Sequence, residues 1–163
     1  MSVTIGIDCG ITGAIGVVKH GKELVCLHSM PVFRQVKSAK VVLAVDGAGL
    51  ARMLRDIVTE QSMEHIEVVV EKTSAMPGQG VSSTYSMGHS RGVVEGVVQT
   101  LGLPMTLISP SIWKRQMGFN SDKEYVRGQM QMLFPNADLR RKKDHDKAEA
   151  IALALWLHKT KFA

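Results

Sequence analysis

Three short β-prone runs occupy the first part of the chain, at residues 3–8, 13–19 and 23–28. Only a few residues separate neighbouring runs, and both connecting segments, 10–12 and 20–22, contain glycine. Short glycine-containing connections of this kind suit hairpin turns between antiparallel strands. The sequence therefore predicts that the fold begins with an antiparallel meander of three strands.

The middle of the chain changes from irregular to helical and then to extended patterns. After residue 28 the sequence is polar and less regular to about Lys40, where we expect no regular element. Residues 44–61 have apolar side chains at helical spacing, with Asp46 as the expected N-cap. The apolar run that ends at Glu71 is typical of a strand buried on both faces, as in a sheet covered by helices on both sides.

Helical and extended patterns alternate from there to the C-terminus. A helix is predicted at 83–101, a short strand at 105–108, and further helices at 110–116, at 122–134 and from Asp146 onward. Three antiparallel strands followed by alternating strands and helices indicate an α/β fold. We expect a mixed five-stranded sheet with helices on both faces, in one domain.

Four acidic residues stand out by their positions in these elements: Asp8, Glu71, Asp146 and Glu149. Asp8 ends the first strand, Glu71 ends the fourth, and the other two share one face of the last helix because they are three residues apart. If that helix crosses the two strands, the carboxylates converge. Oxygen ligands without a matching Cys/His set favour Mg²⁺ or Mn²⁺ over Zn²⁺. Two such ions can hydrolyse a phosphodiester, which makes a nucleic acid the expected substrate.

Each of these acids also has a purely structural interpretation. Asp8 is equally suited to accept hydrogen bonds in the turn that follows its strand, and Glu71 to form an ion pair with Lys72. Asp146 and Glu149 have the spacing of a helix capping box, in which acids are stabilised by the helix dipole. The residue pattern by itself leaves these alternatives open.

Charge and hydropathy indicate the partner and the compartment. The formal net charge is +5, the sequence pI is near 9.4, and the basic run 140–143 lies directly before the last helix. This balance favours a polyanionic partner, although basic surfaces also serve solubility. No apolar run reaches the roughly 20 residues of a membrane span, and the N-terminal residues lack the features of a signal peptide. We therefore expect a cytoplasmic protein with no membrane partner.

Motifs in order along the chain resemble one family over nearly all of its length. GIDCGITGAIG is similar to the first-strand motif of the RuvC-type Holliday junction resolvases, VVVEK to their second acidic strand, and HDKAEAIALA to their terminal helix. Residues 88–92, GHSRG, resemble a further helical landmark of the family. The resemblance implies a ribonuclease H-like fold, with residues 1–163 forming a single RuvC-like nuclease domain.

The resemblance also implies an activity and its cofactor. Such a protein is an endodeoxyribonuclease that binds a four-way DNA junction as a homodimer and cuts two opposed strands symmetrically. Other branched DNA would be further substrates. Each subunit would hold two Mg²⁺ ions, for which Mn²⁺ substitutes, through four carboxylates: Asp8, Glu71, Asp146 and Glu149. The family usually has aspartate where this chain has Glu149, so the neighbouring Asp144 and His145 are additional candidates.

The same resemblance suggests DNA-binding residues, namely Lys114, Lys123, Arg91, Arg140, Arg141, Lys142 and Lys143. For an isolated lysine on a helix, the alternative is a solvated surface position. The family often places an aromatic wedge in the loop after the second acidic strand. Here that loop contains Met76 and Gln79, with Tyr85 further on, and this departure favours a phage over a bacterial source.

Three other functions compete with this interpretation. The segment DCGITG also resembles the phosphate loop of actin-like ATPases and sugar kinases, but those proteins have two such domains. Ordinary ribonuclease H shares the fold and the metals, yet it typically carries its glutamate on the first helix. A module that binds branched DNA without cutting it would gain nothing from carboxylates beside phosphates.

Overall fold

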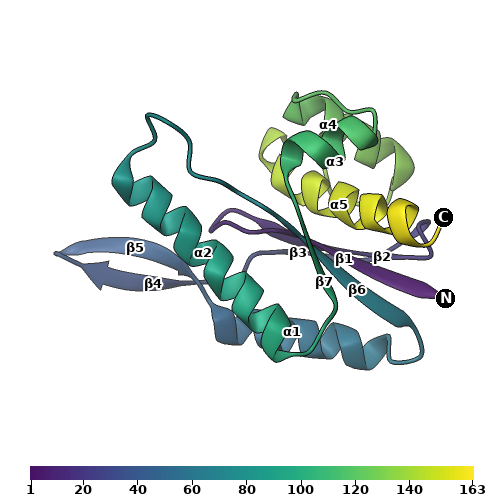
Figure 1. The fold of residues 1–163 in the computed structure, drawn as a ribbon, viewed down its shortest axis with the longest axis horizontal. Coiled ribbons are helices and arrows are strands. Elements are labelled where there is room, and N and C mark those ends of the chain that lie inside the picture. Colours follow the sequence, from purple (N-terminus) through teal and green to yellow (C-terminus); the bar gives the residue numbers. More distant parts are fainter.

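A computed structural model describes residues 1–163 and contains a mixed sheet of five strands (Figure 1). The strands lie in the order β3-β2-β1-β6-β7. The first three are antiparallel, whereas β6 runs parallel to β1 and β7 runs parallel to β6. The predicted antiparallel meander is thereby confirmed, and β1 lies at the centre of the sheet. The strand bounds are β1 (Ser2–Asp8), β2 (Ala14–Lys19), β3 (Glu23–Ser29), β6 (His65–Glu71) and β7 (Met105–Ile108).

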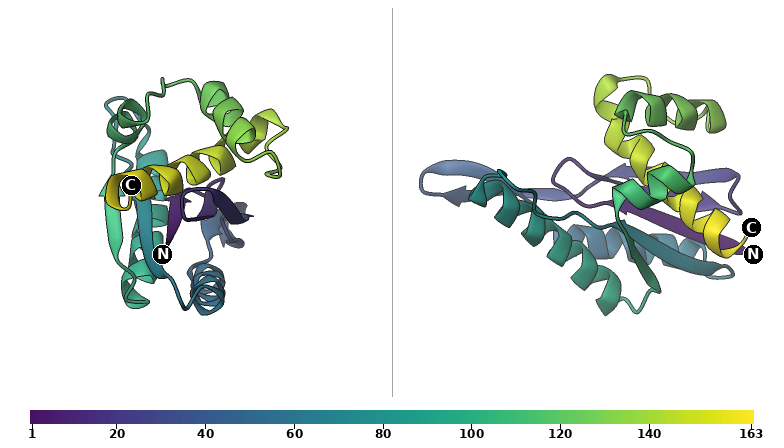
Figure 2. Two further views of the ribbon diagram at one scale, coloured as in Figure 1. Left: turned by 90° about the vertical axis from the view of Figure 1, so that its right-hand side faces the viewer. Right: turned by 45° about the horizontal axis from the view of Figure 1, so that its top comes forward.

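Helices cover both faces of this sheet, as expected for a ribonuclease H-like α/β fold (Figures 1 and 2). Two buried apolar clusters result, one under α1 and α2 and the other under α3, α4 and α5. A short 3-10 helix, η1, leads directly into α5. The bounds are α1 (Gly47–Glu60), α2 (Val81–Thr100), α3 (Pro110–Gln116), α4 (Lys123–Leu133), η1 (Lys142–Asp144) and α5 (His145–Lys161).

The α5 helix packs unusually close to the sheet. Gly6 of β1 and Gly16 of β2 are opposite each other in the antiparallel register. A Cβ atom on Gly6 would lie 2.1 Å from the carbonyl oxygen of Ala150, and one on Gly16 would lie 2.9 Å from the backbone nitrogen of Ile151. Both glycines are therefore required for the observed packing, since any side chain there would collide with the α5 backbone.

The region expected to be irregular instead forms a hairpin, which corrects the sequence-based interpretation. Strands β4 (Val32–Lys37) and β5 (Lys40–Val45) pair only with each other and extend beyond the main sheet (Figure 1). The turn residues Ser38 and Ala39 have φ angles of 49° and 62°. Two-residue hairpin turns of this hand usually contain glycine or asparagine, so the sequence carried no familiar turn signal.

The helix boundaries agree with the prediction to within a few residues. Helix α1 begins at Gly47 rather than at residue 44, because β5 continues to Val45. Asp46 caps the helix as expected, and its carboxylate accepts a hydrogen bond from the Gly49 backbone at 3.0 Å. None of the helices combines the length and the apolar composition needed to cross a membrane.

Candidate active site

Three of the four predicted acids meet at one place. Asp8 lies at the carboxyl end of β1, and Asp146 and Glu149 lie in the first turns of α5. One carboxylate oxygen from each residue lies within 4.8 Å of the others. They converge because β1 occupies the centre of the sheet and α5 packs directly across it. Asp8 forms no hydrogen bond in the turn that follows its strand, so its turn-forming alternative is not observed.

Glu71 lies beside this group at the carboxyl end of β6, next to β1 in the sheet. Its carboxylate is only 8% exposed, and its Oε2 atom accepts a hydrogen bond from the indole Nε1 of Trp113 at 2.8 Å. The alternative ion pair with Lys72 is absent, because Lys72 is exposed and the carboxylate turns inward. Trp113 is fully buried, and no feature of the sequence indicates its bond to Glu71.

The electrostatics of the site are those of crowded, buried carboxylates. Burial raises the pKa of Asp8 well above its ordinary value, and the negative charges of Glu71 and Asp146 raise that pKa further. Burial also raises the pKa of Glu71, an effect that the Trp113 hydrogen bond opposes. Groups of this kind are stabilised in their charged form only when a cation lies nearby. The arrangement therefore favours cation binding.

Two lysines supply part of the missing positive charge. The Nζ atom of Lys114, from α3, lies 2.5 Å from Oε1 of Glu149. The Nζ atom of Lys123, at the start of α4, lies 3.6 Å from Oδ1 of Asp146. Both lysines were predicted to lie near the reacting phosphate, and the fold brings both to the acidic group. Lys123 remains about half exposed, so its ammonium can reach a ligand in solvent.

The chemistry of the donor set fits a hard divalent cation. All of its candidate ligand atoms are carboxylate oxygens, which Mg²⁺ and Mn²⁺ prefer. The nearest sulfur belongs to Cys9, whose thiol donates a hydrogen bond to the Glu71 carbonyl oxygen at 3.3 Å. Burial raises the pKa of that thiol to about 12. Cys9 therefore stays protonated at neutral pH and connects the ends of β1 and β6 instead of offering a thiolate ligand.

Asp144 and His145, the two additional candidates, differ in their surroundings. Asp144 is not among the three converging acids, and its carboxylate accepts hydrogen bonds from the backbone and guanidinium of Arg141 at 2.9 and 3.0 Å. The Arg141 hydrogen bond lowers the pKa of that carboxyl. His145 lies at the edge of the site, with Nε2 3.1 Å from Oδ1 of Asp146. The alternative in which Asp146 and Glu149 form a capping box is not observed, because α5 begins at His145 and the N-cap position belongs to Asp144.

The basic run before α5 is exposed to solvent, as a phosphate-binding segment would be. Arg140 is paired with Asp138 at 3.3 Å and is largely exposed, while Arg141 makes the contacts to Asp144 described above. Lys142 and Lys143 lie on the short helix η1 and form no ion pair. This segment leads directly into the acidic end of α5, so Lys142 and Lys143 are only a few residues from Asp146 in the sequence.

Arg91 has a different environment from the other basic candidates. Its Nη1 atom donates to the Thr73 carbonyl oxygen at 2.9 Å, and its Nε atom contacts the Glu95 carboxylate. It therefore fastens the loop after Glu71 to α2. In that loop Met76 is 67% exposed, and its backbone nitrogen donates to the Gln79 side chain at 3.2 Å.

Comparison with known proteins identifies the fold. No protein-family model matches the chain, and no curated protein matches it in sequence. Among solved structures, the chain is similar to RuvC of T. thermophilus in complex with a Holliday junction substrate, with a TM-score of 0.67 and 19% identity over 99% of this chain and 97% of that one. A further Thermus thermophilus RuvC structure gives a TM-score of 0.57 and 19% identity, over 94% and 92% of the two chains. The chain thus has the ribonuclease H-like fold of these proteins.

Proposed function

We propose that this protein is a divalent-metal-dependent endodeoxyribonuclease that resolves four-way DNA junctions by hydrolysing phosphodiester bonds. The observation that carries the proposal is the convergence of Asp8, Asp146 and Glu149, with Glu71 beside them. A similar fold in a protein bound to a Holliday junction supports the choice of substrate. Other branched DNA would be accepted for the same reason.

Four residues would hold the metal: Asp8, Glu71, Asp146 and Glu149. Bound there, two Mg²⁺ or Mn²⁺ ions would activate the attacking water and stabilise the leaving oxygen. The protein's own contribution is positional. Burial excludes water from the carboxylates, and the Trp113 indole restrains one oxygen of Glu71. A fixed set of charged ligands avoids the cost of reorganising them when the phosphate enters.

Cations around the site would bind the DNA backbone. Lys123 and the exposed residues Lys142 and Lys143 offer ammonium groups to phosphates on the two sides of the acidic group. Lys114 lies deeper, against Glu149, and would neutralise charge at the scissile phosphate. Contacts of this type determine affinity and register without reading base sequence.

We also propose that the active form is a homodimer. Resolving a four-way junction requires a cut in each of two strands, whereas the chain brings together one acidic group. Two copies related by a twofold axis would present two such groups to opposed strands. Sedimentation velocity of the purified protein tests this, with a dimeric mass as the expected result.

The decisive experiment uses a synthetic four-way junction, a linear duplex of the same sequence and an RNA–DNA hybrid. We expect symmetrical cleavage of the junction with Mg²⁺ or Mn²⁺, none with a chelator, and much slower cutting of the duplex. Asp8→Asn should bind the junction and leave it intact. Equal cutting of the hybrid with indifference to junctions would instead indicate a ribonuclease H activity. Junction binding without any cleavage would indicate a non-catalytic binding module.

A further inference from the structure

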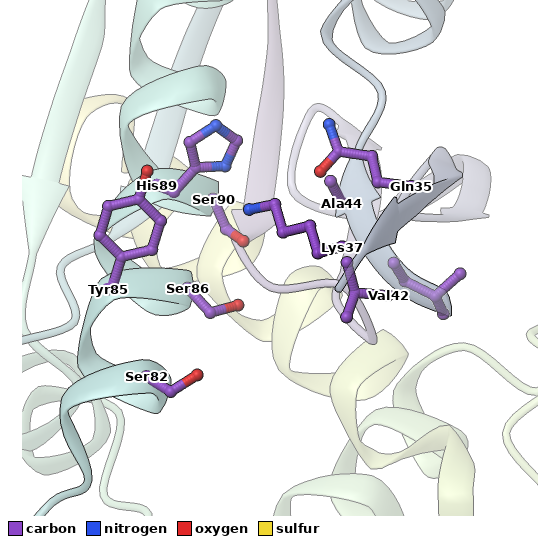
Figure 3. Close-up of a pocket in the computed structure, with 10 residues that line it drawn as sticks. Gln35, Lys37, Val42, Ala44, Ser82, Tyr85, Ser86, His89 and Ser90 are labelled. Atoms are coloured by element: carbon purple, nitrogen blue, oxygen red, sulfur yellow. The ribbon is translucent and has the colours of Figure 1, made fainter. Parts of the chain in front are cut away.

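A cleft separates the β4–β5 hairpin from α2 (Figure 3). Its volume is about 170 Å³, and most of its lining side chains are polar. Lys37 extends from the hairpin toward α2, where Ser86, His89 and Ser90 face it (Figure 3). The ammonium, hydroxyl and imidazole groups of these residues are all able to donate hydrogen bonds. The cleft therefore presents donors to whatever enters it.

The two segments that form this cleft contain cations but no acidic residue. Residues 31–45, which include the hairpin, contain Arg34, Lys37 and Lys40. Residues 72–94 contain Lys72 and Arg91, of which Arg91 is paired with Glu95 in the next turn of α2. The whole chain has 15 aspartates and glutamates, so their absence from both segments leaves this end of the molecule electropositive. Such a surface attracts a polyanion.

The cleft continues toward the candidate active site. A second hollow, of about 430 Å³, lies between α2 and the turn 10–12 that follows Asp8, and it shares Ser82, Ser86 and Ser90 with the cleft. A third hollow, of about 440 Å³, shares Thr12 with the second one. The third hollow is lined by residues of the basic run and of the acidic group, including Arg141, Lys143 and Asp146. A polar track thus connects the carboxylates to the hairpin.

Two polar side chains along this track are placed to contact a ligand. Ser90 is 3% exposed and lines both the cleft and the second hollow. Lys37 forms no ion pair, and its Nζ atom lies 5.9 Å from the centre of the Tyr85 ring. That ring in turn stacks on His89, with centroids 6.2 Å apart. A free ammonium beside several hydroxyl groups favours an anionic ligand with several acceptor atoms.

We propose that the hairpin–α2 cleft is a second binding site for the DNA backbone, and that it holds a strand leaving the active site. This inference rests on the proposed function and adds to it a region that extends beyond the main sheet. Lys37 binds a phosphate, and the serine and histidine side chains of α2 donate to phosphate oxygens on the same strand. Since all these contacts are to the backbone, the site contributes affinity and orientation without base specificity.

The test measures junction binding as a function of salt in the Asp8→Asn background, so that the DNA stays uncut. We expect Lys37→Gln/Lys40→Gln to lower the slope of log Kd against log salt by at least about 0.9, since Lys37 makes one phosphate contact and each lost contact removes about 0.9. Affinity at 0.1 M salt should fall about tenfold or more. The matched control, Lys22→Gln/Lys159→Gln, removes two exposed lysines that form no ion pair and lie elsewhere on the surface.

A second variant tests the cleft without removing a cation. Ser86→Glu places a carboxylate at an exposed position of α2 that lines the cleft, and we expect it to weaken junction binding at least as much as the double lysine variant. Thermal melting of each variant checks that it is folded. Because Ser86 is exposed on a helix, glutamate should be tolerated there.

The outcomes separate this inference from the proposed function. If the otherwise unchanged protein cuts junctions but the lysine variant keeps the salt slope of its control, the cleft assignment alone is overturned. A lysine variant that dissociates into monomers, while its salt slope stays unchanged, would indicate that a second copy of the chain occupies the cleft. That result would also overturn the assignment of the cleft to DNA. Failure of the unchanged protein to bind or cut a junction would overturn both proposals.

Discussion

The two long helices of this protein, α5 and α2, have opposite relations to the sheet. Helix α5 has 17 residues, and every residue from Ala148 to Leu157 is buried. Helix α2 has 20 residues, of which only Ser90, Val94 and Val98 are buried. A helix that is apolar on all sides must be enclosed, whereas one with a narrow buried face keeps the rest of its surface available. From this difference we expect α5 to hold the acidic group in place and α2 to keep a face available to a ligand.

That separation has a functional consequence. The acids of α5 are held in position by the core, because the helix cannot shift without disturbing β1 and β2 beneath it. Ser82, Ser86 and His89 of α2 are exposed, so we expect substitutions there to change binding more than folding. We therefore expect changes near α5 to affect metal binding, cleavage and stability, and changes on α2 to affect affinity.

The largest effect is expected at the acidic end of α5. Asp146→Asn removes the charge that the site needs to hold a cation while preserving the shape of the side chain. Cleavage of a four-way junction should fall about 1000-fold, which corresponds to about 4 kcal/mol of transition-state stabilisation. Junction binding measured with a chelator should be unchanged or tighter, because a negative charge near the phosphates is lost. Normal cleavage by this variant would remove α5 from the mechanism.

Close packing beneath α5 gives the next test. Gly6→Ala would place a methyl group 2.1 Å from the Ala150 carbonyl oxygen and 2.6 Å from the Ala154 backbone nitrogen. Because both clashes are with backbone, the helix has to move, and we expect a loss of about 3 kcal/mol in the free energy of unfolding. Urea denaturation measures this loss. A change below about 0.5 kcal/mol would show that α5 is held less tightly than described.

The hydrogen bond from Trp113 to Glu71 predicts a change in metal requirement. Trp113→Phe keeps a buried ring but removes the N–H group that restrains Oε2 of Glu71. The Mg²⁺ concentration for half-maximal cleavage should rise about 10–100-fold. Titration calorimetry with Mg²⁺ should show the same weakening without any DNA.

A matched control exists for this tryptophan. Trp156→Phe is the same chemical change, and it removes a 2.7 Å bond to Gln116 instead of one to a carboxylate. This variant should keep the Mg²⁺ requirement of the unchanged protein. Equal metal affinity in the two tryptophan variants would mean that Glu71 does not depend on its indole partner.

The buried carboxylates also predict how stability depends on pH. The pKa values of Asp8 and Glu71 are raised in the folded protein, so the folded state holds more protons than the unfolded chain. Without metal, the stability present below about pH 4 should decline as pH rises through the folded pKa values. Adding Mg²⁺ should reverse this decline, since a bound cation stabilises the charged form.

Thermal melting across this pH range measures the effect. Other acids, such as Glu67 and Asp144, have lowered pKa values and oppose the trend at low pH. The comparison with Asp8→Asn therefore isolates the contribution of the site. Identical pH profiles for the two proteins, with and without Mg²⁺, would contradict the electrostatic description of the acidic group.

The smallest effect is expected on the open side of α2. Gly92 is exposed in the helix interior, and a Cβ atom there would have no neighbour within 4 Å. Gly92→Ala should stabilise the protein by about 0.5–1 kcal/mol, because alanine has the higher helix propensity. Gly6→Ala is expected to destabilise the protein strongly. The difference in unfolding free energy between the two alanine variants therefore measures how differently α5 and α2 are packed. Destabilisation by Gly92→Ala would mean that another chain covers this face.

Much of the fold was predictable because its signals are local. Short glycine-containing connections indicated the meander, and the position of each acid at the end of a strand or the start of a helix indicated where the carboxylates converge. The hairpin after β3 was not predicted, because Ser38 and Ala39 adopt the turn without the usual glycine. Local patterns cannot reveal a turn built from residues that rarely form one.

The missed parts of the site depend on long-range contacts. Trp113 and Glu71 are 42 positions apart in the chain, and only the approach of α3 to the end of β6 brings them together. Arg91 holds the Thr73 carbonyl, a backbone group that no sequence pattern identifies, while its contact with DNA stays a prediction. Side-chain partners of this kind become visible only when the packing of the elements is known.

The facing pair Gly6 and Gly16 has a consequence for the spacing of the carboxylates. Since backbone atoms of the sheet and of α5 meet there directly, main-chain contact sets how high the helix stands above the strands. The distance between the backbones of β1 and α5 therefore has a lower limit, which changes of side-chain rotamer cannot alter. With the backbones fixed, the distance between the carboxylates depends on side-chain length. Glu149 has one methylene more than an aspartate, so its carboxylate reaches further from α5.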